Sequence, residues 1–335
     1  MWTKIQIIDR MRHYLKTKNM KTLQYILLGF TFIVFLSCKK NDTSDFSYTT
    51  PVLLGDPNIL LHDGVYYAYG TNASDGIEVY TSDNLETWRK SSRLALHKDS
   101  TWASRWFWAP EVYYIAEKNK FFMYFTAEEH IGVATSDSPL GPFTQEVKEP
   151  MWTDQKAIDN SLYIDDDGKA YLYFVRFNDG SVVWVAELED DLKTIKSETL
   201  RQCIVTSQGW ENIRGRINEG PFVVKHKGTY YMTYSANHFE SPYYGVGYAT
   251  ANSPMGPWTK YAGNPILQKP ADLVGVGHHS LFTDKEGQLK MVFHAHYSQQ
   301  TVLPRVMYIT DVNFSSDAVP VMEASDDIIR PVVLK

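Results

Sequence analysis

The stretch GDPNILLHDGVYYAYGTNASDGIEVYTS, residues 55–82, contains the pattern that decides the fold. An apolar run ends at the turn His62-Asp63-Gly64, an aromatic-rich run follows at 65–71, and a third short run occupies 76–82. Short runs that are rich in β-branched and aromatic residues and are bounded by turn residues are typical of β-strands. Glycine in the turn supplies the positive φ angle that a tight hairpin demands. The stretch therefore predicts three consecutive short strands.

The same unit recurs four more times along the chain, with turns at 117–119, 165–168, 225–228 and 284–287. The expected second strands are 65–71, 121–127, 170–176, 229–236 and 289–295, and the expected third strands are 76–82, 131–137, 181–188, 244–251 and 305–312. A repeat of roughly 50 residues with three or four strands is typical of a β-propeller blade, whereas a β-sandwich does not require a repeated unit. The sequence therefore predicts an all-β fold, a five-bladed β-propeller in a single domain.

The distribution of charge excludes one class of partner. Residues 1–38 contain six of the 33 basic and one of the 39 acidic side chains, so the remainder has 27 basic and 38 acidic side chains and a net charge of −11. Nucleic-acid phosphates need a basic protein surface. We therefore expect no nucleic-acid partner, and an acidic body of this kind suits a neutral substrate.

The N-terminus resembles a bacterial lipoprotein signal. The apolar run Leu23–Leu36 follows a basic stretch and is shorter than the about 20 residues that a transmembrane helix needs. It ends just before Cys38, the residue that the resemblance marks for lipidation, and Met20 is the expected true start. The expected location is the bacterial cell envelope, with the lipid in the outer membrane and the protein on its surface or in the periplasm. The expected order of segments is signal peptide 1–38, flexible linker 39–50 and propeller domain 51–335.

A charged or titratable residue stands near the start of each repeat. Counting back eight or nine residues from each turn gives Asp56, Glu111, Asp159, Glu219 and His278. The first strand of each propeller blade lines the central channel, so we expect these five residues at equivalent positions that converge at one end of the axis. Clustered like charges shift pKa values and destabilise a fold, and they are typical of catalytic or metal sites.

Carboxylates around an axial pocket suit the hydrolysis of a glycosidic bond. That reaction needs a protonated acid at the leaving oxygen and an ionised base or nucleophile near the anomeric carbon. The two protonation states must be kept apart by their environments. A third carboxylate beside the acid raises the pKa of the acid by like-charge repulsion, and Asp159 is physically suited to this role.

At these residues the chain resembles glycoside hydrolase family 43, from about Gly55 to Phe314. The motifs that carry the resemblance are GDP at 55–57, WAPE at 108–111, IDNS at 158–161, NEGP at 218–221, GHHS at 277–280 and Arg305. Asn160 departs from the family pattern, in which many members have proline at this position.

The resemblance implies a five-bladed propeller that hydrolyses glycosides with inversion of configuration. It implies that Asp56 is the general base, Glu219 the general acid and Asp159 the residue that modulates the pKa of the acid. An inverting acid and base should lie roughly 6.5–9.5 Å apart, which leaves room for the attacking water.

The resemblance also suggests substrate contacts and an ion. Trp108, Glu111, Arg305 and His278 are the expected substrate-binding residues. His278 is in addition a candidate ligand for a structural calcium ion in the axial channel, although calcium prefers several oxygen ligands. The hydrolysis requires no cofactor.

Other candidate residues are expected to be structural. Cys203 is expected to be a buried small apolar residue. His294 and His296 alternate on one face of a strand, and no third metal ligand is evident beside them. The acidic run 165–168 is expected to be a hairpin turn and not a calcium loop.

The expected activity is that of an exo-acting α-L-arabinofuranosidase, a β-xylosidase or both, on arabinose- or xylose-containing plant oligosaccharides and polysaccharides. An endo-arabinanase and an exo-galactanase of the same family stay open. A non-catalytic glycan-binding propeller is the alternative from a different class, and the presence of both Asp56 and Glu219 favours the enzyme. The preference for a pentose depends on the resemblance and on no single residue.

Overall fold

The computed structural model describes residues 50–334, and the architecture below refers to this part of the chain. Its regular structure is β-strand, with short 3-10 helices in the connections at Lys98–Ser100, Ala116–Lys118, Ser197–Thr199 and Gly209–Asn212. Within these residues no helix has the length and apolar character needed to cross a membrane. The expected signal peptide, Cys38 and the linker up to residue 49 lie outside the described residues.

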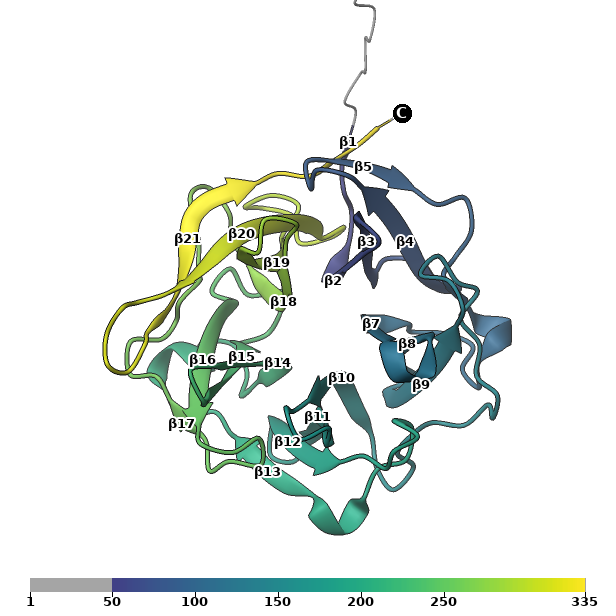
Figure 1. The fold of residues 1–335 in the computed structure, drawn as a ribbon. Helices are drawn as coiled ribbons and strands as arrows, with labels where there is room; N and C mark the ends of the chain where they lie inside the picture. Colours follow the sequence, from purple (N-terminus) through teal and green to yellow (C-terminus); the bar gives the residue numbers. More distant parts are fainter. Residues whose placement is uncertain (1–49, 335) are drawn as a thin grey trace, which may run out of the picture. The chain divides into compact units, whose positions relative to one another are not determined.

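The strands take successive positions from the axis outward (Figure 1). The innermost strands are β2 (Gly55–His62), β7 (Trp108–Ile115), β10 (Ala157–Ile164), β14 (Asn218–His226) and β18 (Gly277–Thr283). The second strands are β3 (Val65–Thr71), β8 (Lys120–Ala127), β11 (Ala170–Phe177), β15 (Thr229–Ala236) and β19 (Leu289–Ala295). The third strands are β4 (Gly76–Ser82), β9 (His130–Ser136), β12 (Ser181–Glu187), β16 (Gly245–Ala251) and β20 (Val306–Phe314). The outer strands are β5 (Thr87–Lys90), β13 (Arg201–Ile204), β17 (Thr259–Lys260) and β21 (Met322–Ile329), with the short strands β1 (Thr50–Pro51), β6 (Leu96–His97) and β22 (Val332–Val333).

The described strands form five sheets, and Figure 1 shows them side by side around a central axis. The sheets are β2–β5 with β1, β6 and β22, then β7–β9, β10–β13, β14–β17 and β18–β21. The first three strands of every sheet pair antiparallel in chain order. The prediction of an all-β propeller is confirmed.

The turn residues place the strands where the sequence predicts them. In the first hairpin His62 pairs with Val65, and the intervening Asp63 and Gly64 both have positive φ, 48° and 74°. Two consecutive residues with positive φ match the twist of the flanking strands, which is why Asp-Gly is favoured there. The second and third strands agree with their predicted bounds to within two residues.

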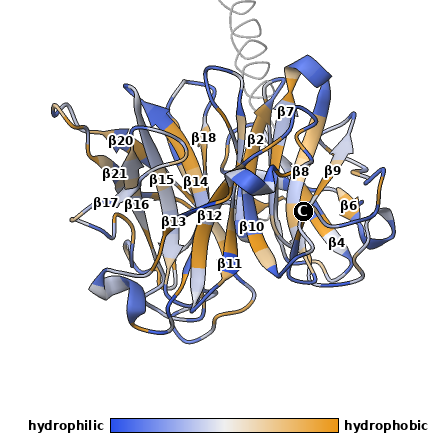
Figure 2. Ribbon diagram, turned by 90° about the horizontal axis from the view of Figure 1, so that it is seen from below, coloured by the Kyte–Doolittle hydropathy of each residue, from blue (hydrophilic) through white to orange (hydrophobic). Residues whose placement is uncertain are grey.

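The hydrophobic core is divided among the gaps between neighbouring sheets. Separate clusters fill the gaps between the first and second sheets, the second and third, the third and fourth, the fourth and fifth, and the fifth and first. Hydrophobic residues concentrate on the strands and hydrophilic ones in the connections at either end (Figure 2). Because the fifth sheet packs against the first, the ring of sheets is closed and its inner edges meet at the axis.

The first sheet also joins the two ends of the domain. The late strand β22 pairs antiparallel with β1 and parallel with β5 of the first sheet. Backbone hydrogen bonds extend this junction, with the Val52 N–H donating to Pro331 O at 3.2 Å. The last strands of the chain therefore fasten the fifth sheet to the first.

A β-bulge interrupts each innermost strand near its start. The bulged tetrapeptides are Gly55-Asp56-Pro57-Asn58, Trp108-Ala109-Pro110-Glu111, Ile158-Asp159-Asn160-Ser161, Glu219-Gly220-Pro221-Phe222 and Gly277-His278-His279-Ser280. The second residue of each has a positive φ, between 42° and 57°. Bulges re-aim side chains next to active sites, and here the same device occurs five times around the axis.

The bulges correct one part of the sequence analysis. Counting back from the turns treated Glu111 and Glu219 as equivalent to Asp56, whereas Glu219 is the first residue of its tetrapeptide and Glu111 the fourth. The count was wrong for Glu111 because the second hairpin contains the 3-10 helix Ala116–Lys118, and for Glu219 because its hairpin has a two-residue turn like the first but was counted one residue further back. Asp56, Asp159 and His278 are equivalent to one another, as predicted.

Candidate active site

A pocket of about 730 Å³ opens where the innermost strands begin. This volume lies within the range of ordinary ligand sites. It is lined by the titratable residues Asp56, Asp159, Glu219, His278 and Arg305 and by the apolar residues Trp108, Ile158, Phe177, Ile217, Phe239 and Leu303. A lining that combines apolar side chains with a few titratable groups suits a neutral ligand that reacts in the pocket.

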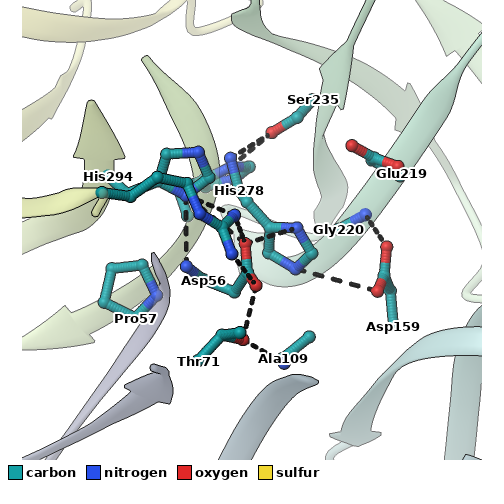
Figure 3. A network of polar contacts seen from close by, with 12 residues as sticks. Asp56, Pro57, Thr71, Ala109, Asp159, Glu219, Gly220, Ser235, His278 and His294 are labelled. Carbon is teal, nitrogen blue, oxygen red and sulfur yellow. Dashed lines mark hydrogen bonds and ion pairs between the residues drawn. The ribbon is translucent and has the colours of Figure 1, made fainter. Parts of the chain in front are cut away.

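Asp56 lies at the centre of the polar network drawn in Figure 3. Its carboxylate forms a bidentate ion pair with Arg305, in which Nη1 contacts Oδ1 and Nη2 donates to Oδ2 at 2.9 Å. Thr71 Oγ1 donates to Oδ2 at 2.5 Å, and His278 Nδ1 lies 3.3 Å from Oδ1. Burial alone would raise the pKa of Asp56, but the positive charge of Arg305, with smaller contributions from the neighbouring rings of His278 and His294, holds the pKa well below its usual value. Asp56 is therefore ionised.

The residue before Asp56 makes room for this ion pair. A Cβ atom on Gly55 would lie 2.3 Å from Cζ of Arg305, so any larger side chain would displace the guanidinium. Arg305 also packs over the ring of Phe239, with Cζ 5.1 Å from the ring centroid. The glycine of the GDP motif is thus explained by the approach of an arginine from the far end of the domain.

Glu219 has a different environment although it lines the same pocket. The hydroxyl of Tyr244 donates to Glu219 Oε1 at 2.8 Å. Burial raises the pKa of Glu219 to about 7, the Tyr244 hydrogen bond opposes the rise, and the negative charge of Asp56 adds to it. Glu219 therefore keeps a proton to near neutral pH.

Asp159 lies beside Glu219 and is also shifted upward. Its Oδ2 accepts from the backbone N–H of Gly220 at 3.3 Å, and its own backbone N–H donates to Thr126 Oγ1 at 2.9 Å. Burial and the charges of Glu219 and Asp56 raise the pKa of Asp159 well above its usual value. Two interacting carboxyl groups in this position titrate as a pair, so Asp159 and Glu219 together retain a proton where Asp56 does not.

His278 lies between the ionised and the protonated carboxyl groups. Its Nδ1 faces Asp56 Oδ1, and its Nε2 is 4.0 Å from Asp159 Oδ1. The backbone N–H donates to Ser235 Oγ at 2.8 Å (Figure 3). Gly220 brings its backbone close to this ring, since a Cβ there would lie 3.2 Å from His278 Cδ2. Burial lowers the pKa of His278, so the ring is neutral at pH 7.

Glu111 is the predicted site residue that the structure places outside the pocket. It lines a small cavity of about 10 Å³ on the axis, behind Asp56 and Asp159, and its carboxyl contacts the Tyr113 hydroxyl. Burial raises the pKa of Glu111 to about 8. The expected contact of Glu111 with substrate does not fit this position, because the fourth residue of the bulge faces the axial cavity instead of the pocket.

Trp108 and Arg305 line the pocket, as their predicted substrate contacts require. The Trp108 ring stacks on Trp106, with ring centroids 5.9 Å apart and planes at 14°. Trp106 is 44% exposed and carries the guanidinium of Arg105 over its ring. The aromatic wall thus continues from the pocket to the outer surface.

The sequence analysis missed three residues of the site. Thr71 was within an expected strand. Its pairing with Gly55, the residue before Asp56, was the signal that could have identified it as part of the site. His294 was expected to be structural, but its Nδ1 accepts from the backbone N–H of Asp56 at 3.1 Å. Tyr244 precedes a strand and had no signal in the sequence.

The residues that were expected to be structural are otherwise placed as predicted. His296 Nε2 contacts Phe239 O at 2.8 Å, and the 165–168 run closes the hairpin between β10 and β11. Cys203 differs from its prediction: it was expected to be buried and is only partly buried against the core, where burial raises its pKa. Between residues 50 and 334 no group of three or more His, Cys, Asp or Glu side chains is arranged to hold a metal ion.

Comparison with known proteins agrees with this geometry. The chain is similar to a solved structure described as an endo-1,4-β-xylanase from Bacteroides thetaiotaomicron, with 49% identity, a TM-score of 0.82, and coverage of 85% of this chain and 98% of the other. It is 29% identical to a β-D-galactofuranosidase of Aspergillus niger over 77% of this chain and 79% of that protein. It is also 29% identical to an arabinoxylan arabinofuranohydrolase of Paenibacillus polymyxa over 72% of this chain, and spans 44% of that protein.

A family model provides the assignment. The model described as glycosyl hydrolases family 43 matches residues 48–320, which include every residue of the pocket. The match begins before the first innermost strand and ends within the last sheet, so it covers all five bulges and the acidic, basic and aromatic groups around them. From this match and from the solved structure of the same architecture, we conclude that the chain belongs to glycosyl hydrolases family 43.

Proposed function

We propose that this protein is an inverting, exo-acting glycoside hydrolase in which Asp56 is the general base and Glu219 the general acid. The observation that carries the proposal is the opposite protonation of two carboxyl groups in one pocket. Asp56 is held ionised by Arg305, whereas burial raises the pKa of Glu219 to about 7. An inverting glycosidase needs this pair of states at the same time.

The hydrolysis then proceeds in one displacement. Asp56 accepts a proton from a water molecule, and the oxygen of that water attacks the anomeric carbon. Glu219 gives its proton to the glycosidic oxygen as the bond from that oxygen to the anomeric carbon breaks. The products are the inverted sugar and the freed alcohol, and one proton has moved from Glu219 to the leaving group while Asp56 has gained another.

Asp159 maintains the acid in its protonated state. It lies beside Glu219; burial raises the pKa of both carboxyl groups, and the negative charge of Glu219 raises the pKa of Asp159 further. When one of the pair ionises, the other is harder to ionise, so the pair keeps a proton for the leaving group. This is the role of a pKa modulator that the sequence analysis expected of Asp159.

The proposed substrate is a plant-type glycan that ends in arabinose or xylose. The walls of the pocket are apolar, with Trp108, Phe177 and Phe239 among them, which suits the carbon faces of an uncharged sugar. The names of similar proteins include arabinofuranose, galactofuranose and xylan substrates. We propose α-L-arabinofuranosidase or β-xylosidase activity, or both.

A panel of nitrophenyl glycosides with arabinan, arabinoxylan and galactan tests this function. Release of arabinose or xylose, with the anomer of the product observed by proton NMR, is the expected result. Internal cleavage into long oligosaccharides would indicate an endo-acting enzyme, and galactose release would indicate a galactanase. Binding without hydrolysis of any member of the panel would overturn the proposal in favour of a glycan-binding propeller.

We propose that each of the five sheets is one blade of a five-bladed propeller. The sheet β7–β9 has three strands where the others have at least four, and a blade of three strands still occupies one fifth of the ring. The five core clusters support this count, because one lies in each gap between neighbouring sheets.

The axial cavity behind the pocket fits a water molecule. Asn160 Oδ1 and His279 Nε2 line the cavity region and are buried without a hydrogen-bond partner, and a volume near 10 Å³ admits one water. A calcium ion fits less well, since calcium prefers several oxygen ligands and both ring nitrogens of His278 already face carboxyl groups of the protein. Calcium stays a prediction from the resemblance, which metal analysis of the purified protein and activity after EDTA treatment would test.

We further propose that the protein is attached to the bacterial cell envelope through a lipid on Cys38. The support is the sequence alone: a basic stretch, a short apolar run and the cysteine that follows it. The variant Cys38→Ser should move the protein from the membrane to the soluble fraction. Retention of Cys38→Ser in membranes would contradict lipidation.

A further inference from the structure

Two stacked aromatic rings connect the proposed acid to the proposed base. The Tyr244 hydroxyl donates to Glu219 Oε1 at 2.8 Å. The ring of His294 stacks on the ring of Tyr244, with centroids 5.7 Å apart and planes at 17°. Nδ1 of His294 in turn accepts from the backbone N–H of Asp56 at 3.1 Å. The contacts therefore run without interruption from one carboxylate to the other, through residues of three sheets.

Both rings are fixed in place by burial. Tyr244 and His294 have no exposed surface, so neither can change rotamer without opening the core. The structure also provides space for Tyr244 at the first position of the fifth bulge, where a Cβ atom on Gly277 would lie 2.4 Å from Tyr244 Cε1. Gly277 thus leaves room for the Tyr244 ring, as Gly55 leaves room for the Arg305 guanidinium.

The direction of the hydrogen bond determines where the acid proton resides. A phenol with a pKa raised by burial stays protonated, so Tyr244 is the donor and Glu219 Oε1 the acceptor. A neutral carboxyl group has one oxygen that carries the proton and one that accepts. Since Oε1 accepts from Tyr244, the proton resides on Oε2, and Glu219 lines the pocket in which the glycosidic oxygen would lie.

We propose that Tyr244 is a positioning residue that keeps the acid proton of Glu219 on Oε2, the oxygen that does not accept from Tyr244, and that His294 keeps Tyr244 in a fixed relation to Asp56. The proposal deepens the proposed function and rests on it. Tyr244 touches neither substrate nor reacting atoms in this role. It acts through Glu219, and the aromatic pair sets the place of the acid relative to the base.

The variant Tyr244→Phe tests the proposal because it removes the hydroxyl and keeps the ring. Loss of a hydrogen bond that favours the carboxylate raises the pKa of Glu219, so the alkaline limb of the pH profile of kcat/KM should move up by roughly one pH unit. With substrates that have a poor leaving group, kcat should fall about tenfold, a part of the 10²–10⁴ that general acid catalysis contributes. With a dinitrophenyl glycoside, whose leaving group needs no proton, kcat should change less than twofold.

Tyr231→Phe is the matched control. Tyr231 is also fully buried, and its hydroxyl donates to the backbone oxygen of Pro320 at 2.7 Å, remote from the pocket. It should lose similar thermal stability and leave the pH profile and the leaving-group dependence unchanged. Thermal unfolding of both variants shows that they are folded before the kinetics are compared.

Three outcomes separate the inference from the function. A Tyr244→Phe enzyme with a wild-type pH profile and wild-type kcat on poor leaving groups would overturn the inference while the proposed function stands. A shift of the alkaline limb in both Tyr244→Phe and Tyr231→Phe would also overturn it, because the effect would then be structural. Wild-type protein without hydrolysis of any glycoside would instead overturn the proposed function.

Discussion

The two sides of the pocket hold carboxyl groups that differ in their partners, and Asp56 is buried whereas Glu219 is partly buried. Asp56 faces the guanidinium of Arg305, the imidazole of His278 and the hydroxyl of Thr71, whereas the Glu219 carboxylate accepts from the neutral hydroxyl of Tyr244. Burial raises the pKa of each group, and only on the Asp56 side does a cation reverse it. The protonation state of each carboxyl group in this site therefore depends on the groups that contact it and not on how deeply it is buried.

The largest effect should follow from removing the ionised side. Asp56→Asn keeps the shape of the side chain and abolishes its basicity, so kcat should fall about 10³- to 10⁴-fold while sugar binding stays measurable by calorimetry. The control is Asp165→Asn, which removes a carboxylate bound by Lys225 in the turn at the other end of β10. This control variant should lose some thermal stability and keep its activity. An active Asp56→Asn enzyme would refute the base assignment.

Removing the protonated side should have a smaller and more selective effect. Glu219→Gln cannot deliver a proton, so turnover of oligosaccharides should fall roughly 10²- to 10³-fold. Nitrophenyl and dinitrophenyl glycosides should be affected progressively less, because their leaving groups need less protonation. Equal losses on all leaving groups would show that Glu219 acts in some other way.

Removing the guanidinium of Arg305 should bring the pKa of Asp56 closer to that of Glu219. Because Arg305 lowers the pKa of Asp56, the variant Arg305→Met should raise it, and the acidic limb of kcat/KM should move to higher pH by about one unit. Activity at pH values below the shifted limb should fall about tenfold, with little change from this cause near neutral pH. Arg330→Met, which breaks an exposed ion pair with Asp272, is the control and should leave the profile in place. An unmoved acidic limb in Arg305→Met would mean that the base is not Asp56.

The smallest change should come from the neutral partner of the base. Thr71→Val keeps the volume and removes the hydrogen bond to Asp56 Oδ2. The acidic limb should move up by roughly half a pH unit and kcat/KM should fall about threefold, since a single hydrogen bond to a charged group is involved. Measuring kcat/KM against pH for the variant and for the wild type tests this prediction. A shift larger than that of Arg305→Met would reverse the order of importance inferred here.

The sequence was sufficient for the strands and for the identity of the main site residues. Turn residues such as Asp63-Gly64 repeat at regular intervals, and hairpin geometry is local, so the bounds of β3 could be predicted without knowing the fold. Asp56, Asp159 and His278 were found because each occupies the same position in its repeat. The family motifs then added the roles that repetition alone could not provide.

The sequence could not provide the contacts that ring closure creates. His294 reaches Asp56 from another sheet, and Tyr244 reaches Glu219 from the residue just before the third strand of the same sheet; no local pattern records either contact. The register of Glu111 was wrong because a 3-10 turn lengthens its hairpin. Its displacement by two residues moved it from the pocket to the axial cavity, a difference of environment that a count along the chain cannot detect.

The five bulges place selection for activity in conflict with selection for stability. Positive φ is uncommon for residues other than glycine, although Asn, Asp and His tolerate it better than most, and Asp56, Asp159 and His278 all occupy such positions. The two bulges without a functional side chain there carry the small residues Ala109 and Gly220. Laboratory selection for thermal stability alone would thus favour glycine at positions 159 and 278, because glycine removes the backbone strain there. Side chains of the site would then be lost first at the positions where the substitution stabilises the backbone most.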